Sequence, residues 1–304
     1  KILFCLAIST IFLQLSFAQS LNQIGEWSDP IPFGIVPVAV ANLPDGRLIC
    51  WSSQFRDTFR DAADGSTFTE IFDPSIGLNG MALGETVTQT NHDMFCPGIN
   101  NLPDGRILSA GGTTSQKTSI YDWRTNSWSA VNDMNIPRGY QGNVTLANGS
   151  VFTVGGSWGG GAYGNRDAEI WTENSGWSLL SGIKGSDFFT NNDLLKDSQG
   201  LYRVDNHAWL WVAPDASLFH AGPSEQMNWI DLQGNGSVSS AGLRSNDTYS
   251  MKGTTVMFDI GKLLKVGVPV LVIGGLIAGW GAREANRQMV ADAYNDMKTQ
   301  IQQR

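Results

Sequence analysis

The hydrophobic positions of the chain form short runs separated by turn-forming residues. One such run follows LPDGR at residues 43–47, and the pattern recurs in LPDGRILSAGG at 102–112 and LANGSVFTVGG at 146–156. A polar turn that contains Gly and leads into an apolar run is typical of a β-hairpin. We therefore predict three equivalent hairpins, two of which end in a pair of glycines.

A second repeated element follows the glycine pairs. SIYDWRTNSW at 119–128 and AEIWTENSGW at 168–177 align with their final tryptophans in register, and further turn–strand units occur at 215–222 and 261–267. This is the kelch pattern, in which a four-stranded unit of about 44–50 residues is one propeller blade. The sequence predicts an all-β propeller with about four blades present and a fifth begun.

The register of the repeats predicts which residues lie close together. The innermost strand of each blade faces the propeller axis, so matching positions in successive blades become neighbours. Counting back nine residues from each hairpin turn glycine gives Pro37, Cys96 and Tyr140, and the same count from Ala216 gives His207. We expect Cys96 and Tyr140 to occupy equivalent sites in adjacent blades.

Composition supports the fold class and limits the function. The chain has 35 glycines and 11 tryptophans but only 16% charged residues, which suits short strands and tight turns better than a helical bundle. The formal net charge of -8 excludes a nucleic-acid-binding surface, which needs clustered Lys and Arg.

The first 18 residues have the pattern of a secretory signal peptide. Lys1 is followed by an apolar run, and small residues precede Gln19 where cleavage would occur. This predicts a mature protein that begins at residue 19 and is secreted. For Cys50 and Cys96, which then remain, a disulfide is the ordinary alternative in an oxidising compartment. Four Asn-x-Ser/Thr sequons fit the same route, at Asn143, Asn148, Asn235 and Asn246.

The chain changes character after the propeller-like region, which we place at residues 19–265. Residues 266–282 carry no charge, and 283–304 are polar with helical apolar spacing. Residues 266–282 could be a transmembrane anchor, but the length is about 25 Å as a helix, slightly short of a hydrocarbon core. A buried strand followed by a surface helix, or sequence joined on by a gene-model error, are the alternatives.

Six separated motifs make the chain recognisable. They are HDMFCPG at 92–98, PRGYQ at 137–141, GGSWG at 155–159, QGLYR at 199–203, DNHAW at 205–209, and AGP at 221–223 with MNW at 227–229. In order and spacing they resemble galactose oxidase, of the kelch-type copper radical oxidases, over about residues 27–267. Glyoxal oxidases are the nearest related group, but Trp158 and the NHAW block favour the galactose oxidase side.

The resemblance implies a seven-bladed catalytic propeller with a radical cofactor. It implies that Cys96 and Tyr140 form a thioether cross-link, and that Tyr140 is both a copper ligand and the radical site. Trp158 resembles the family tryptophan that stacks over the cross-link. Oxidising a primary alcohol removes two electrons whereas one copper ion cycles by one, so the modified tyrosine would be the second one-electron store.

The resemblance also suggests substrate contacts. Arg203 resembles the arginine that hydrogen-bonds sugar hydroxyls, and Phe59 resembles an aromatic wall against the sugar. His207 is expected near the substrate rather than as a metal ligand. His92 and His220 are expected to be structural.

The resemblance stops near Val268, where the family would continue its strand with a glycine. The family's second tyrosine ligand with its adjacent histidine, its further histidine ligand and its last blades are not found downstream, so Tyr140 alone represents the copper ligands. The resemblance implies an oxidase that converts a primary alcohol, galactose or a related carbohydrate, to an aldehyde while O2 becomes H2O2. This chain is expected to be incomplete and inactive alone. A non-catalytic carbohydrate-binding or membrane-tethered partial propeller is the alternative.

Overall fold

The computed structural model describes residues 30–58, 65–79, 84–156, 166–188, 207–213, 216–244 and 255. The chain divides into two compact units, Lys1–Met251 and Lys252–Arg304, and the description below concerns the first. Residues 1–18, 266–282 and 283–304, for which the sequence predicts a signal peptide, an anchor or strand, and a polar helix, lie outside the described ranges. Within those ranges, no helix is long and apolar enough to cross a membrane.

The described part of the first unit is all-β, as predicted. Its strands form antiparallel sheets of four, each built from strands that follow one another along the chain. The first sheet contains β1 (Ala39–Asn42), β2 (Leu48–Trp51), β3 (Thr67–Phe72) and β4 (Glu85–Val87), and the second contains β5 (Gly98–Asn101), β6 (Ile107–Ala110), β7 (Thr118–Asp122) and β8 (Ser127–Val131). The third contains β9 (Gly142–Thr145), β10 (Val151–Val154), β11 (Ala168–Thr172) and β12 (Gly176–Leu180), and the fourth contains β13 (Leu210–Val212), β14 (Leu218–His220), β15 (Gln226–Asp231) and β16 (Ser237–Leu243). Short 3₁₀ helices, η1 (Pro74–Asn79) and η2 (Gly185–Phe188), accompany them.

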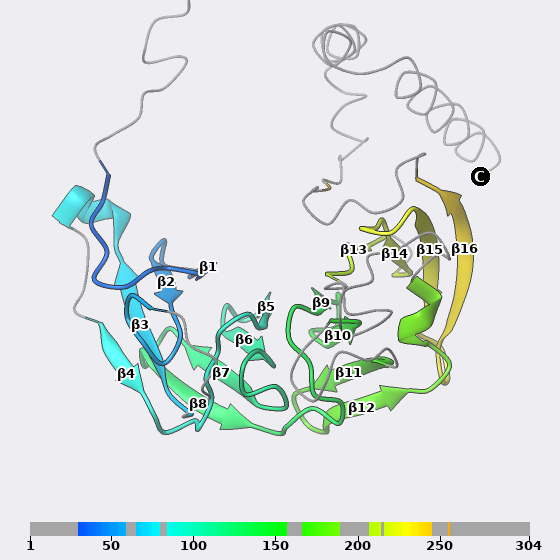
Figure 1. The fold of residues 1–304 in the computed structure, drawn as a ribbon, viewed down its shortest axis with the longest axis horizontal. Coiled ribbons are helices and arrows are strands. Elements are labelled where there is room, and N and C mark those ends of the chain that lie inside the picture. Colours follow the sequence, from blue (N-terminus) through cyan, green and yellow to red (C-terminus); the bar gives the residue numbers. More distant parts are fainter. Residues whose placement is uncertain are drawn as a thin grey trace, which may run out of the picture. The chain divides into compact units, whose positions relative to one another are not determined.

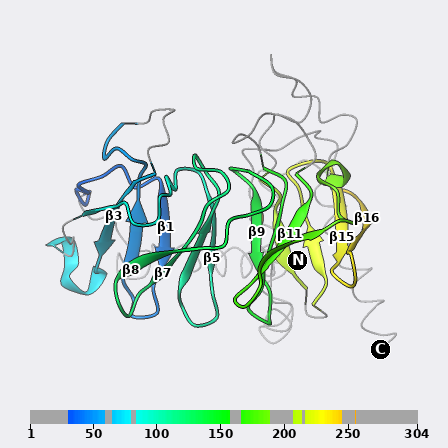
Figure 2. The same cartoon turned by 90° about the horizontal axis from the view of Figure 1, so that it is seen from below.

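The sheets are arranged as consecutive propeller blades. The first strands β1, β5, β9 and β13 are neighbours in that order, as Figure 1 shows. In the view of Figure 2, strands β5 and β9 run beside each other, and the remaining strands of their two sheets extend away on opposite sides. The predicted kelch-type architecture is therefore confirmed for the four described sheets.

Each predicted hairpin turn closes with the same pair of backbone hydrogen bonds. In the first, Leu43 N–H donates to the Arg47 carbonyl (2.8 Å) and Gly46 N–H donates to the Leu43 carbonyl (3.0 Å). The equivalent bonds recur at Leu102, Leu146 and Ala213. Gly46 has a φ of +90°, a backbone conformation that glycine adopts without steric cost. This explains why the same turn sequence is repeated.

Hydrophobic residues fill the spaces between successive sheets. Alternate residues of a strand point to opposite faces, so Ile107 packs toward the first sheet while Leu108 packs toward the third. Likewise, Val151 of β10 packs toward the second sheet and Phe152 packs toward the fourth. Because the middle strands β6 and β10 are buried on both faces, each blade is stabilised mainly by its neighbours.

Candidate functional site

Cys96 and Tyr140 occupy matching positions in the second and third sheets. Each precedes the first strand of its sheet by two residues, and each has a left-handed backbone, with φ of +59° and +57°. The Tyr140 N–H donates to the Cys96 carbonyl across 3.1 Å. A non-glycine residue in this conformation is strained and persists only where the surroundings impose it. Because two such residues are hydrogen-bonded to each other here, the surrounding fold must impose this conformation on both.

His207 reaches the same place from the fourth sheet. It precedes β13, and its ring centroid lies 5.2 Å from that of Tyr140 with the planes inclined by 60°. Ala216, from which His207 was counted, takes the turn position with a φ of +69°, as the glycines of the other hairpins do. The structure thus joins the backbones of Cys96 and Tyr140 and brings the rings of Tyr140 and His207 together, from three successive sheets. Their chemical roles stay predictions.

The glycine pair after β6 allows the two site segments to approach the sheet. A Cβ on Gly111 would overlap the Arg138 carbonyl oxygen, and a Cβ on Gly112 would overlap the Phe95 carbonyl oxygen. The Gly112 N–H donates to the Arg138 backbone carbonyl (3.0 Å), and the Thr113 N–H donates to the Phe95 backbone carbonyl (2.9 Å). The predicted strand ending therefore has a specific task. The two glycines let the segments that contain Cys96 and Tyr140 pack closely against the end of β6.

His92, four residues before Cys96, is fully buried, and both of its ring nitrogens are hydrogen-bonded within the protein. Its Nε2 lies 2.8 Å from the Gly111 carbonyl and its Nδ1 lies 2.9 Å from the Ser119 hydroxyl. Because the carbonyl can only accept, Nε2 carries the proton and Nδ1 accepts from Ser119. Burial lowers the pKa of His92 to about 4, so the ring is neutral.

His220 is buried in the fourth sheet. Its ring makes an edge contact with Phe188 (4.8 Å between centroids), and burial lowers its pKa to about 3. A neutral ring packed in this way fits the structural role expected of it.

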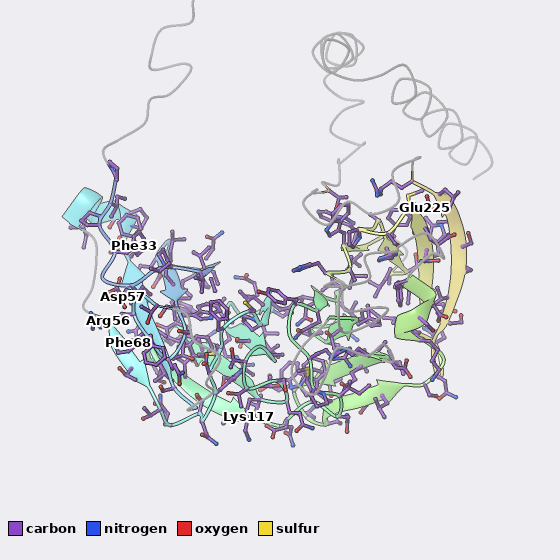
Figure 3. The ribbon with its side chains drawn as sticks, in the orientation of Figure 1. Phe33, Arg56, Asp57, Phe68, Lys117 and Glu225 are labelled. Atoms are coloured by element: carbon purple, nitrogen blue, oxygen red, sulfur yellow. The ribbon has the colours of Figure 1, made fainter. Side chains whose placement is uncertain are left out.

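Three predicted site residues, Phe59, Trp158 and Arg203, lie outside the described residues. The segment that leads toward Phe59 is described as far as Thr58. There the Arg56 guanidinium stands 4.9 Å from the ring centroid of Phe68, on the first sheet (Figure 3). The proposed substrate contacts of Phe59 and Arg203, and the stacking of Trp158, stay predictions.

The described residues alone do not fit a copper ion. Among them, no group of three or more His, Cys, Asp or Glu side chains could hold a metal. Tyr140 is the one proposed ligand, with the backbone of Cys96 and the ring of His207 in contact with it. The cysteines at 50 and 96 do not form a disulfide, so the thiol of Cys96 is not held in that alternative pairing.

Sequence reasoning missed a buried ion pair next to the site. Arg138 Nη2 lies 2.9 Å from Glu169 Oε1, and both side chains are 0% exposed. The signal was present, since Arg138 stands within the PRGYQ motif and Glu169 lies in a strand between apolar neighbours. A charged residue at such a position needs a buried partner.

Comparison with known proteins identifies the relationship. Two galactose oxidase sequences from Gibberella zeae, one of them from strain PH-1, are each 41% identical to the chain over 265 residues, which is 84% of this chain. The chain is a relative of galactose oxidase. It spans 38% of the length of those galactose oxidases. No family model matches.

A solved structure agrees with the galactose oxidase relationship. It is a fungal alcohol oxidase of the AA5 family, in complex with copper, and is 36% identical with a TM-score of 0.68. The match covers 78% of this chain and 47% of the other. The four-stranded sheets of the chain thus share the fold of the matching part of that structure.

Proposed function

We propose that the chain carries the radical-forming part of a galactose oxidase-like active site. The observation that supports this most directly is the placement of Cys96 beside Tyr140, at equivalent blade positions and with their backbones joined by a 3.1 Å hydrogen bond. The proposed reaction is oxidation of a primary alcohol to an aldehyde, in which O2 takes up two electrons and two protons and becomes H2O2.

The proposed cofactor is a thioether between Cys96 and Tyr140. Forming its C–S bond removes the thiol hydrogen and one ring hydrogen, and O2 accepts those two electrons and two protons as H2O2. The sulfur substituent lowers the oxidation potential of the phenol, which would then store one electron. Copper would supply the second one-electron exchange, with Tyr140 as the one ligand proposed from the described residues and the remaining ligands from residues outside them.

The surroundings suit a tyrosine that must hold one geometry. The left-handed backbone of Tyr140 is fixed from the Cys96 side, and the ring of His207 packs against its ring. His207 is proposed to face the alcohol, together with Arg203 and Phe59, and Trp158 is proposed to cover the cross-link. A galactose-like carbohydrate is the proposed substrate class.

The function is tested by peroxide production. The chain is expressed with copper, and H2O2 is measured with galactose and O2, beside the Tyr140→Phe variant as control. The same assay on the product of the full-length transcript tests whether further residues are needed for activity. Peroxide from either protein that disappears in Tyr140→Phe supports the proposal. Galactose binding without peroxide from either would instead support the non-catalytic alternative.

We also propose that the protein is secreted, from the signal-like pattern of residues 1–18. Protein recovered from the culture medium should begin at Gln19. Retention of residues 1–18 in a protein that stays inside the cell would contradict this.

A further inference from the structure

Arg138 lies two residues before Tyr140, and every N–H of its guanidinium is hydrogen-bonded. Its guanidinium makes five hydrogen bonds, which satisfies every N–H it has. Nη2 donates to Glu169 (2.9 Å) and to the Asp167 carbonyl (2.8 Å). Nη1 donates to the carbonyls of Gly155 (3.2 Å) and Arg166 (3.3 Å), and Nε donates to Ile136 (3.3 Å). The side chain therefore fastens its segment to β11 and to the glycine pair that follows β10.

Glu169 holds the same segment at a second point. Its carboxylate accepts from the Asn135 N–H (2.8 Å), from Asn135 Nδ2 (2.8 Å) and from the Ile136 N–H (2.9 Å), as well as from Arg138. A buried ion pair is costly unless its remaining donors and acceptors are satisfied. Here the remaining donors of Arg138 and acceptors of Glu169 are hydrogen-bonded, so the surrounding backbone compensates for the burial of both charges.

The backbone beyond Arg138 is confined from both sides. The Arg138 carbonyl accepts from the Gly112 N–H, and a Cβ on Gly156 would stand 2.5 Å from the Gly139 carbonyl oxygen. Tyr140 follows directly, in its left-handed conformation against Cys96. The side-chain bonds of Arg138 thus fix the start of the segment, and the close glycine contacts fix its path to Tyr140.

We propose that Arg138 and Glu169 are positioning residues that hold Tyr140 in its strained backbone conformation beside Cys96. This inference rests on the proposed function only for its meaning in catalysis, because the placement itself can be measured without copper. Neither residue is proposed to touch the substrate.

The test measures how accessible the partly buried Cys96 is in protein prepared without copper. The rate of Cys96 alkylation by iodoacetamide is followed by peptide mass spectrometry in wild type, Arg138→Met and Glu169→Gln. The buried thiol of Cys50, whose pKa burial raises to about 11, reports global unfolding in the same sample. Leu218→Ala, in the fourth sheet, serves as a destabilised control compared at an equal distance below its melting midpoint.

We expect Cys96 to react at least about tenfold faster in Arg138→Met, because the Tyr140 segment opens locally once the buried pair is broken. Cys50 should stay slow, Leu218→Ala should match wild type, and Arg138→Lys should recover part of the protection. Equal rates at Cys96 in wild type, Arg138→Met and Glu169→Gln would overturn the inference, as would equal acceleration in Leu218→Ala.

A second measurement separates this inference from the proposed function. Copper and O2 are added, and the yield of the Cys96–Tyr140 cross-linked peptide is compared among the same proteins. Slower cross-linking in Arg138→Met and Glu169→Gln than in wild type supports both proposals. If no protein cross-links but the alkylation rates differ as expected, the positioning stands and the proposed cofactor is wrong.

Discussion

The close approach of the Arg138 carbonyl to Gly111 gives a quantitative prediction for Gly111→Ala. Gly111 has a φ of +72°, and an added Cβ would overlap that carbonyl oxygen. Gly234 is a matched control, since its φ is +62° and a Cβ there would have nothing within 4 Å. Alanine in a left-handed conformation costs about 1–2 kcal/mol at either site.

The two variants should differ by the cost of the overlap alone. To admit the methyl group, the Arg138 carbonyl must move, which weakens its 3.0 Å hydrogen bond from the Gly112 N–H. Leaving a buried backbone group poorly paired costs about 1–3 kcal/mol. Gly111→Ala should therefore be less stable than Gly234→Ala by about 1–3 kcal/mol, or about 2–12 °C in melting midpoint for a domain of this size.

Urea denaturation is the suitable assay, with the midpoint compared at an unchanged m-value. Gly111→Ala should also accelerate Cys96 alkylation, since the displaced carbonyl belongs to the segment of Tyr140. Equal loss of stability in Gly111→Ala and Gly234→Ala would refute the claim that the glycine pair is needed for close approach.

Two further predictions concern pH and glycosylation. The pKa of His92 is lowered to about 4 and that of His220 to about 3, both below the unfolded value, so their contribution is fully present above about pH 6.5 and is lost as the pH falls through the folded pKa. Each should remove about 2 kcal/mol of stability by pH 5, and urea unfolding of His92→Gln should show a flatter pH dependence between pH 6.5 and 5 than wild type; an unchanged slope would contradict the assignment. Of the described sequons, Asn148 and Asn235 lie in exposed turns, whereas Asn143 accepts a 2.6 Å hydrogen bond from a neighbouring threonine and its Nδ2 is buried. In protein from a eukaryotic secretory host, glycopeptide mass spectrometry should find glycans on the first two and none on Asn143; a glycan on Asn143 would mean that β9 is exposed during or after folding.

The sequence was sufficient for the fold because the repeat is visible in it. The hairpin turns have similar residues and the same pair of backbone hydrogen bonds, so a count of nine positions led from three of the turns to matching blade positions at Cys96, Tyr140 and His207. This count worked even at Ala216, where no glycine marks the turn. Repeated local chemistry thus gave long-range proximity, which a single strand could not have given.

The sequence was not sufficient for the contacts between segments. The task of Gly111 and Gly112 depends on which carbonyls approach them, and those belong to Arg138 and Phe95, on other turns of the chain. The pairing of Arg138 with Glu169 likewise joins residues that have no common motif. Such contacts follow from the way that blades stack, and spacing within one repeat does not contain them.

The central claim, that this galactose oxidase relative carries a tyrosine–cysteine radical cofactor, is tested most directly by the covalent state of Tyr140. The product of the full-length transcript is prepared with and without copper, exposed to O2, digested and analysed by mass spectrometry. With copper, we expect one peptide that joins Cys96 to Tyr140, with a mass lower by two hydrogens than the sum of its parts, and none without copper. Separate, unmodified peptides of Cys96 and Tyr140 under both conditions would contradict the claim.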